Sequence, residues 1–116
     1  MSRTSAERRG RLGEIRAAWH LRIRGYRILD RRVRTPRGEI DLVAKRRGLI
    51  VFVEVKTRAT PAELDLAIDE PRLARVAAAA EILAPEYARN GEDIRIDVIL
   101  IAPGHKLRHI ENAWMG

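Results

Sequence analysis

The sequence has no cysteine, and it has no run of apolar residues long enough to cross a membrane. A spanning helix needs about 20 mostly apolar residues in a row, so we expect no membrane partner. The start of the chain lacks the apolar core of a secretory signal peptide, and without cysteine nothing indicates an oxidising compartment. We therefore expect a cytoplasmic protein. An arginine-rich, acid-poor start is also typical of a mitochondrial transit peptide, but the first helix of the fold explains these residues better.

Acidic residues are scarce in the first third of the chain. Residues 1–37 contain 12 Arg and only three acids, Glu7, Glu14 and Asp30, which leaves a local net charge of +9. Of the 23 basic residues in the chain, 20 are Arg, whose planar guanidinium matches two phosphate oxygens at once. This uneven charge favours a polyanionic partner, most simply a nucleic acid. The alternative is a GC-rich genome in which Arg has replaced Lys throughout.

The most informative stretch that the sequence does contain is residues 39–56. Two runs rich in Val, Ile, Leu and Phe, 39–44 and 49–56, flank a polar break that ends in glycine. This pattern predicts a β-hairpin with a short loop over residues 45–48. The second run is apolar almost throughout, as expected for a strand that is covered on both faces.

Four charged residues interrupt these apolar runs. Glu39 and Asp41 lie two apart on the first strand, and Glu54 and Lys56 lie two apart on the second, so each pair shares a face. A symmetric loop over residues 45–48 would set Glu39 opposite Glu54, and opposed residues project to the same face. All four would then form one cluster, which a register slip of one residue would scatter.

Three carboxylates beside one ammonium group are costly unless something neutralises the surplus negative charge. Lys56 neutralises part of it, and a divalent cation would neutralise the rest, so this cluster predicts a metal site. The alternative is a set of cross-strand ion pairs on a solvated hairpin face. The apolar character of the second strand argues against an exposed hairpin and favours the site.

Residues 4–24 carry apolar side chains at spacings of three and four, which predicts an amphipathic helix. We expect its buried stripe to consist of Leu12, Ile15, Trp19 and Ile23. Glu14 lies beside this stripe among small and apolar neighbours, so we expect its carboxylate to be half-buried. The ordinary explanation is an ion pair with Arg11, one turn back, and a functional role is the alternative.

The remaining segments complete an α/β pattern within what we expect to be a single domain over residues 1–116. An edge strand over about 26–34 precedes the hairpin. After the hairpin come a short helical turn over about 60–68, a longer helix over about 69–87, and two strands over about 94–101 and 107–110. A strand, a helix and another strand make a crossover, so strands 49–56 and 94–101 should be parallel neighbours in a mixed sheet. Asp97 inside the last long strand is expected to serve structure, and His20, His105 and His109 to be solvated or packed.

Several short motifs support a specific resemblance. They are Gly10-x-x-Gly13-Glu14, Gly25-Tyr26-x-Ile28-Leu29, Gly38-Glu39-Ile40-Asp41-Leu42-Val43-Ala44, Val51-Phe52-Val53-Glu54-Val55-Lys56-x-Arg58 and Ile96-Asp97-Val98. An acid in one strand followed by Glu-x-Lys in the next resembles the PD-(D/E)XK or restriction-endonuclease-like nuclease superfamily. The whole set is similar to the YraN-like family of small bacterial proteins, which resembles archaeal Holliday junction resolvases. This resemblance implies a restriction-endonuclease-like αβββαβ core with a mixed central sheet flanked by helices.

The resemblance also implies a Mg²⁺- or Mn²⁺-dependent nuclease that hydrolyses phosphodiester bonds of DNA, branched or structured DNA included. Asp41, Glu54 and the backbone carbonyl of Val55 would bind the cation. Lys56 would orient the attacking water or stabilise charge that develops on the phosphorane. The remaining two acids, Glu39 and Glu14, would complete or support a second metal position.

Four arginines are candidates for phosphate contacts that position DNA without reading its sequence: Arg9, Arg11, Arg16 and Arg72. Resolvase-like relatives act as symmetric dimers, so a homodimer is a further expectation. Two features depart from the family pattern. Arg72-Leu73 stands where a Lys, often Lys-Gln, is usual, and the segment between Arg58 and that helix is short. Both border the expected groove, so the alternative is a non-catalytic nucleic-acid-binding module that retains the nuclease fold.

Overall fold

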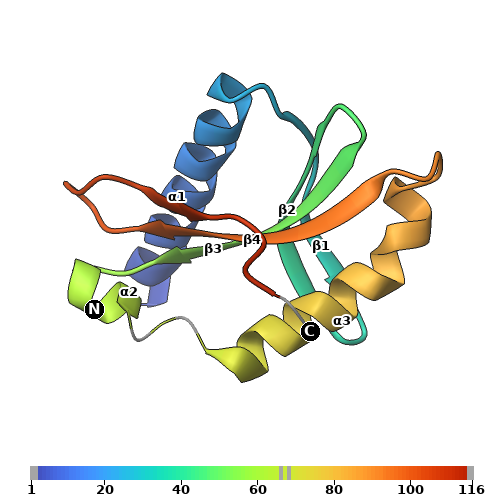
Figure 1. Ribbon diagram of the computed structural model, residues 1–116. Coiled ribbons are helices and arrows are strands. Elements are labelled where there is room, and N and C mark those ends of the chain that lie inside the picture. Colours follow the sequence, from blue (N-terminus) through green and yellow to red (C-terminus); the bar gives the residue numbers. More distant parts are fainter. Residues whose placement is uncertain (1–2, 66, 68, 115–116) are drawn as a thin grey trace.

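The computed structural model describes residues 3–65, 67 and 69–114, with side chains from residue 10 onward (Figure 1). Its elements are α1 (Arg3–Ile23), β1 (Arg27–Thr35), β2 (Gly38–Arg46), β3 (Leu49–Thr57), α2 (Pro61–Asp65), α3 (Glu70–Tyr87), β4 (Asp93–Ile101) and β5 (Arg108–Ile110). The five strands form one sheet in the order β1-β2-β3-β4-β5, in which β3 and β4 are parallel and the other neighbours antiparallel. The expected mixed α/β architecture is therefore confirmed. None of the described helices is long and apolar enough to cross a membrane.

The sheet lies between two helices, with α1 on one face and α3 on the other (Figure 1). The middle strand β3 supplies side chains to both layers. Val51 and Val53 pack on the α1 side, whereas Ile50 and Phe52 pack on the α3 side, and all four are fully buried. Burying each of these side chains contributes about 1.5–3 kcal/mol, so β3 is the strand on which both cores depend.

The β2–β3 turn is shorter than the sequence pattern predicts. Pairing runs from Arg46 opposite Leu49 to Leu42 opposite Val53, so the turn contains two residues, Arg47 and Gly48, in place of the expected four. Arg47 adopts a left-handed backbone conformation with φ of 55°, which lets the strands extend to the tight turn. The expected register was wrong by two residues. Because this error is even, Leu42, Val43 and Ala44 keep their predicted faces, but Ile40 packs on the α3 side with Val43, so alternation in β2 is interrupted at Asp41.

The buried face of α1 also differs from the expected one. Gly13, Ala17, Ala18 and Leu21 face the sheet, whereas the four large residues predicted to be buried, Leu12, Ile15, Trp19 and Ile23, are exposed. The physical reason is the close approach of α1 to the end of β3. A side chain at Gly13 would overlap the hydroxyl of Thr57, so only the face with small residues fits against the sheet.

Asp97 is fully buried in β4, and its carboxylate is completely satisfied by other protein groups. It accepts two hydrogen bonds of 2.8 Å from Arg95, one of 2.8 Å from His109 and one of 3.0 Å from the Asn112 backbone. Burial opposes ionisation, but the hydrogen bonds from His109 and Arg95 outweigh it and keep the pKa of Asp97 below its usual value. His109 also contacts His20 at 3.1 Å, so both histidines are packed in this network. Asp97 thus joins β4 to β5 and α1, as expected for a structural acid.

Replacing Gly13 with alanine tests the close approach of α1 to β3. The added methyl group overlaps Thr57, so Gly13→Ala should lower the free energy of unfolding by about 1–3 kcal/mol in urea titrations. Adding Thr57→Ala should restore part of the loss. Gly10→Ala is the matched control, because nothing lies within 4 Å of a Cβ there, and alanine should stabilise the helix by about 0.5–1 kcal/mol. Equal effects at the two glycines would contradict the packing argument.

Candidate active site

Backbone pairing between β2 and β3 ends at Leu42 and Val53. Beyond this pair, the side chain of Asp41 serves as the acceptor for a backbone N–H of β3. Asp41 accepts a hydrogen bond from the backbone N–H of Val55 through Oδ2, at 2.7 Å. Ile40, the residue before Asp41, packs on the α3 side, whereas Leu42, the residue after it, packs on the α1 side. The carboxylate of Asp41 is therefore held between two strands at the point where their backbones cease to pair.

The ionisation of Asp41 is strongly perturbed. Burial raises the pKa of Asp41 to about 7, and the negative charges of Glu14 and Glu54 add to this effect. The hydrogen bond from Val55 and the positive charge of Lys56 act in the opposite direction but do not cancel it. Glu14 of α1 and Glu54 of β3 thus add to the effect of burial and favour the protonated form of Asp41.

Glu54 and Lys56 form an ion pair at the C-terminal end of β3. The Nζ atom of Lys56 lies 2.7 Å from Oε1 of Glu54, and both side chains are less than one-fifth exposed. They line a cavity of about 170 Å³ together with Glu39 from β2 and residues of α3. Glu39 is exposed and lies 3.6 Å from Arg34, a loose surface contact. The cavity therefore brings together three of the four charged residues of the predicted hairpin cluster.

Glu14 approaches from α1, but its partner differs from the expected one. It accepts hydrogen bonds of 3.0–3.1 Å from Nε and a terminal nitrogen of Arg32 on β1, so the sequence-based pairing with Arg11 is not observed. The pKa of Arg32 is raised first by these hydrogen bonds and further by the negative charges of Glu39 and Asp41. Sequence reasoning missed Arg32 because nothing distinguishes it from the other arginines of β1.

The predicted phosphate-binding arginines are dispersed. Arg72 of α3 lines the cavity with Glu54 and Lys56, and it also lines an adjoining hollow of about 440 Å³ that Arg58 borders. Arg11 is exposed on α1, and Arg16 donates a hydrogen bond of 2.8 Å to the carbonyl of His105.

The side chain of Arg9 lies outside the described residues. Arg75, one turn after Arg72, lines the same cavity and was not predicted, although its i+3 spacing from Arg72 was a signal in the sequence. Of the four predicted arginines, the structure therefore places only Arg72 at the cavity among those whose side chains it describes.

The donor groups at this site meet the chemical needs of a hard divalent cation. Mg²⁺ in proteins commonly uses one or two carboxylates and keeps several waters. Asp41, Glu54 and the carbonyl of Val55 provide two carboxylates and one further oxygen at neighbouring positions, and the raised pKa of Asp41 reflects its burial first and the negative charges of Glu14 and Glu54 second. Among residues 10–65, 67 and 69–114, no three His, Cys, Asp or Glu side chains are already grouped around a common point. Binding would therefore require Glu54 to exchange its contact with Lys56.

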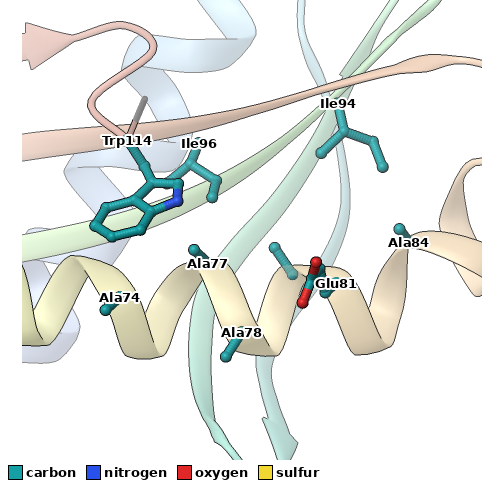
Figure 2. Close-up of a pocket in the computed structure, with 9 residues that line it drawn as sticks. Ala74, Ala77, Ala78, Glu81, Ala84, Ile94, Ile96 and Trp114 are labelled. Carbon is teal, nitrogen blue, oxygen red and sulfur yellow. The ribbon is translucent and has the colours of Figure 1, made fainter. Parts of the chain in front are cut away.

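A larger hollow lies between α3 and β4 and has a different character (Figure 2). It measures about 450 Å³ and is lined mainly by alanines of α3, by Ile94 and Ile96, and by the ring of Trp114. Trp114 packs back against the core there. Glu81 is the one ionisable group in this lining, so the hollow lacks the paired acids and bases that chemistry requires.

Sequence comparison agrees with the motifs. The model of the "Uncharacterised protein family UPF0102" matches residues 13–101, a range that contains every acid of the site. Curated relatives carrying the name UPF0102 protein are 68% identical over 114 residues in Erythrobacter litoralis, 57% in Sphingopyxis alaskensis and 54% in Rhizorhabdus wittichii. Each match covers 98% of this chain and 97–98% of the relative. This is the YraN-like family to which the motifs pointed.

The raised pKa of Asp41 makes a stability prediction for the metal-free protein. The folded state holds this proton more tightly than the unfolded chain, whose carboxyl pKa is 3.8, so the contribution to stability is complete below about pH 4 and is lost as the pH rises through 7. In EDTA, the free energy of unfolding of the wild type should fall between about pH 5.5 and pH 8 by roughly 2 kcal/mol more than that of Asp41→Asn. Asp93→Asn, at an exposed acid of β4, should follow the wild type. Parallel profiles for the wild type and Asp41→Asn would refute the perturbation.

Proposed function

The chain belongs to the uncharacterised protein family UPF0102, and we propose that it is a Mg²⁺- or Mn²⁺-dependent nuclease that hydrolyses phosphodiester bonds of DNA, with branched or structured DNA among its substrates. The observation that carries this proposal is the buried carboxylate of Asp41 on the N–H of Val55, the residue that separates the paired Glu54 and Lys56 where β2 and β3 part. A buried acid with a pKa near neutrality, next to a lysine and a cavity, is typical of a catalytic site.

Asp41, Glu54 and the carbonyl of Val55 would hold the cation. When bound, Mg²⁺ would polarise the phosphate and lower the pKa of a coordinated water. Because Asp41 keeps its proton up to about pH 7 in the free protein, it provides a place where a cation can replace a proton. Val55 contributes twice: its N–H fixes the Asp41 carboxylate, and its carbonyl is the third candidate ligand.

Lys56 would act on the reacting atoms themselves. Its ammonium group neutralises Glu54 in the free protein, and its largely buried side chain lines the cavity. Hydrolysis forms a bond between water oxygen and phosphorus while the bond to the leaving sugar oxygen breaks, and negative charge develops on the phosphoryl oxygens. An ammonium group at this place can orient the water and stabilise that charge.

The remaining charged residues would support the reaction from the rim. Glu39 lines the cavity, whereas Glu14 is held by Arg32 and acts on Asp41 through its charge. Arg72 and Arg75 border the cavity on the α3 side and are suited to contact phosphates that flank the cleaved bond. We assign DNA positioning to these two residues, because Arg16 does not line the cavity.

One observation favours the second candidate function, a nucleic-acid-binding module without catalysis. Two of the acids are already neutralised inside the protein, Glu54 by Lys56 and Glu14 by Arg32. A module that had lost its metal would need such internal pairs to keep the half-buried carboxylates satisfied. The two functions make different predictions about metal-linked stability.

Metal titration with substitution at Asp41 separates the two functions. A nuclease should gain thermal stability from Mn²⁺ or Mg²⁺, and Asp41→Asn should abolish that gain because it removes a ligand. Asp93→Asn, at an exposed position away from the site, is the matched control and should keep the gain. A binding module should show no metal-linked stabilisation, and its affinity for DNA should survive Asp41→Asn.

Cleavage itself should be assayed on branched, duplex and single-stranded DNA with each metal. Asp41→Asn and Lys56→Ala should lower the rate of cleavage by about 10²–10⁴-fold at temperatures where both variants remain folded, since each removes a group that acts in the transition state. If the wild type binds DNA tightly but cleaves none of these substrates, the result would reject the nuclease and support the nucleic-acid-binding module.

The DNA-positioning role of α3 predicts a change in salt dependence. If Arg72 and Arg75 each contact a phosphate, the double replacement by alanine should reduce the slope of log affinity against log salt by about 0.9 per contact. Arg89→Ala at the other end of α3 is the control, because Arg89 is exposed and donates to the carbonyl of Glu86. An unchanged slope in the double variant would assign the phosphate contacts to other residues.

A further inference from the structure

The outer face of α1 carries a continuous apolar stripe that no other described part of the chain covers. We call it the outer stripe, and it consists of Leu12, Ile15, Trp19 and Ile23, which are 60%, 46%, 58% and 83% exposed. The spacings of three and four place all four on one side of the helix, opposite the small residues that contact the sheet. Single exposed apolar residues are common, but an aligned row of four over three turns indicates an interaction surface.

The outer stripe is flanked by positive charge on both sides. At about 100° per residue, Arg11 and Arg22 lie along one flank and Arg16 along the other. The guanidinium carbon of Arg22 lies 5.1 Å from the ring centre of Trp19, so a cation is already held over the indole. Near the C-terminal end of α1, a hollow of about 370 Å³ exposes Trp19 and Ile23 beside Arg16, Arg24 and Lys106.

No acid interrupts this basic border within the described side chains of α1. Among residues 10–23 the only acid is Glu14, which belongs to the sheet side and is bound by Arg32. The surface thus combines exposed aliphatic groups, a tryptophan and arginines on both flanks. An interfacial helix has this composition: its apolar side enters the boundary between head groups and acyl chains, while arginines contact anionic head groups.

We propose that α1 docks on a phospholipid bilayer that carries anionic head groups, with the outer stripe inserted and the helix parallel to the membrane plane. This surface contact differs from spanning the membrane, for which the chain has no suitable helix among its described residues. The expectation of no membrane partner rested on the absence of a spanning segment, and the stripe itself was expected to be buried in the core. The structure shows that the stripe is not buried, because the core uses the opposite face of α1.

Charge decides between a bilayer and a second copy of the chain. If two stripes packed against each other in an antiparallel pair, each basic flank would meet the same flank of the other copy, arginine against arginine. No described acid of α1 is placed to compensate this repulsion. Nucleic acid would match the arginines but offers no apolar interior for Leu12, Ile15 and Ile23. An anionic bilayer satisfies the apolar and the basic parts together.

The test uses the full-length protein and vesicles of defined composition. In a Trp114→Phe background, Trp19 is the only tryptophan, and its emission should move to shorter wavelength with vesicles of phosphatidylglycerol and phosphatidylcholine. Pure phosphatidylcholine vesicles should cause no shift. In co-sedimentation, Ile15→Gln with Ile23→Gln should lower partitioning to anionic vesicles by about tenfold or more, because two inserted side chains lose their apolar contacts.

Two controls separate insertion from other causes. Ile82→Gln changes an exposed isoleucine of α3, 47% accessible, and should leave vesicle binding within about twofold of the wild type. Arg11→Gln with Arg16→Gln should weaken binding and reduce its dependence on salt. The proposal fails if the Ile15 and Ile23 variant binds anionic vesicles as the wild type does, since the attraction would then be electrostatic only. It also fails if the wild type ignores the vesicles and forms a dimer that the same two substitutions dissociate.

Discussion

The hydrogen bond from the Val55 backbone to the Asp41 carboxylate is the contact on which the arrangement of the site depends. It occurs where backbone pairing between β2 and β3 ends, and a side-chain oxygen there accepts an N–H group at 2.7 Å. A buried N–H without an acceptor would cost about 1–3 kcal/mol, so the acid is structurally useful as well as chemically suited to a metal. The same contact holds Asp41 in a buried position, and burial is the first cause of its raised pKa.

The second constraint is the balance of charge around that acid. Each neighbouring carboxylate has a cationic partner, Lys56 for Glu54 and Arg32 for Glu14, whereas among the described residues the hydrogen-bond donor to Asp41 is the backbone N–H of Val55. A half-buried ion pair keeps the free protein stable, but its members remain available for exchange when a stronger charge arrives. The two ion pairs and the raised pKa of Asp41 thus limit the negative charge of the site in the metal-free protein.

The two helices divide the surface into regions of different chemistry. On the α3 side, Arg72 and Arg75 border the cavity that contains Glu54 and Lys56, and charged groups dominate. On the α1 side, the outer stripe is apolar, is flanked by arginines, and includes none of the residues that line the cavity. Because these regions belong to opposite faces of the sheet, a partner on the outer stripe leaves the α3 cavity accessible (Figure 1).

Alternation along β3 depends on local geometry alone, so the sequence was enough to place Glu54 and Lys56 on one face. It did not show that alternation in β2 is interrupted at Asp41, which is not among the residues that line the cavity. The error in the length of the turn did not change the predicted faces of Leu42, Val43 and Ala44, because a shift of two residues preserves the face. The order of elements and the parallel pairing of β3 with β4 were equally predictable, since a crossover helix requires them. The buried side of α1 was not, because the helix has one face of large apolar residues and another of small ones. The short distance between α1 and β3 at Gly13 and Thr57 allows only the face with small residues to pack on the sheet. In this orientation of α1, Glu14 reaches Arg32 of β1.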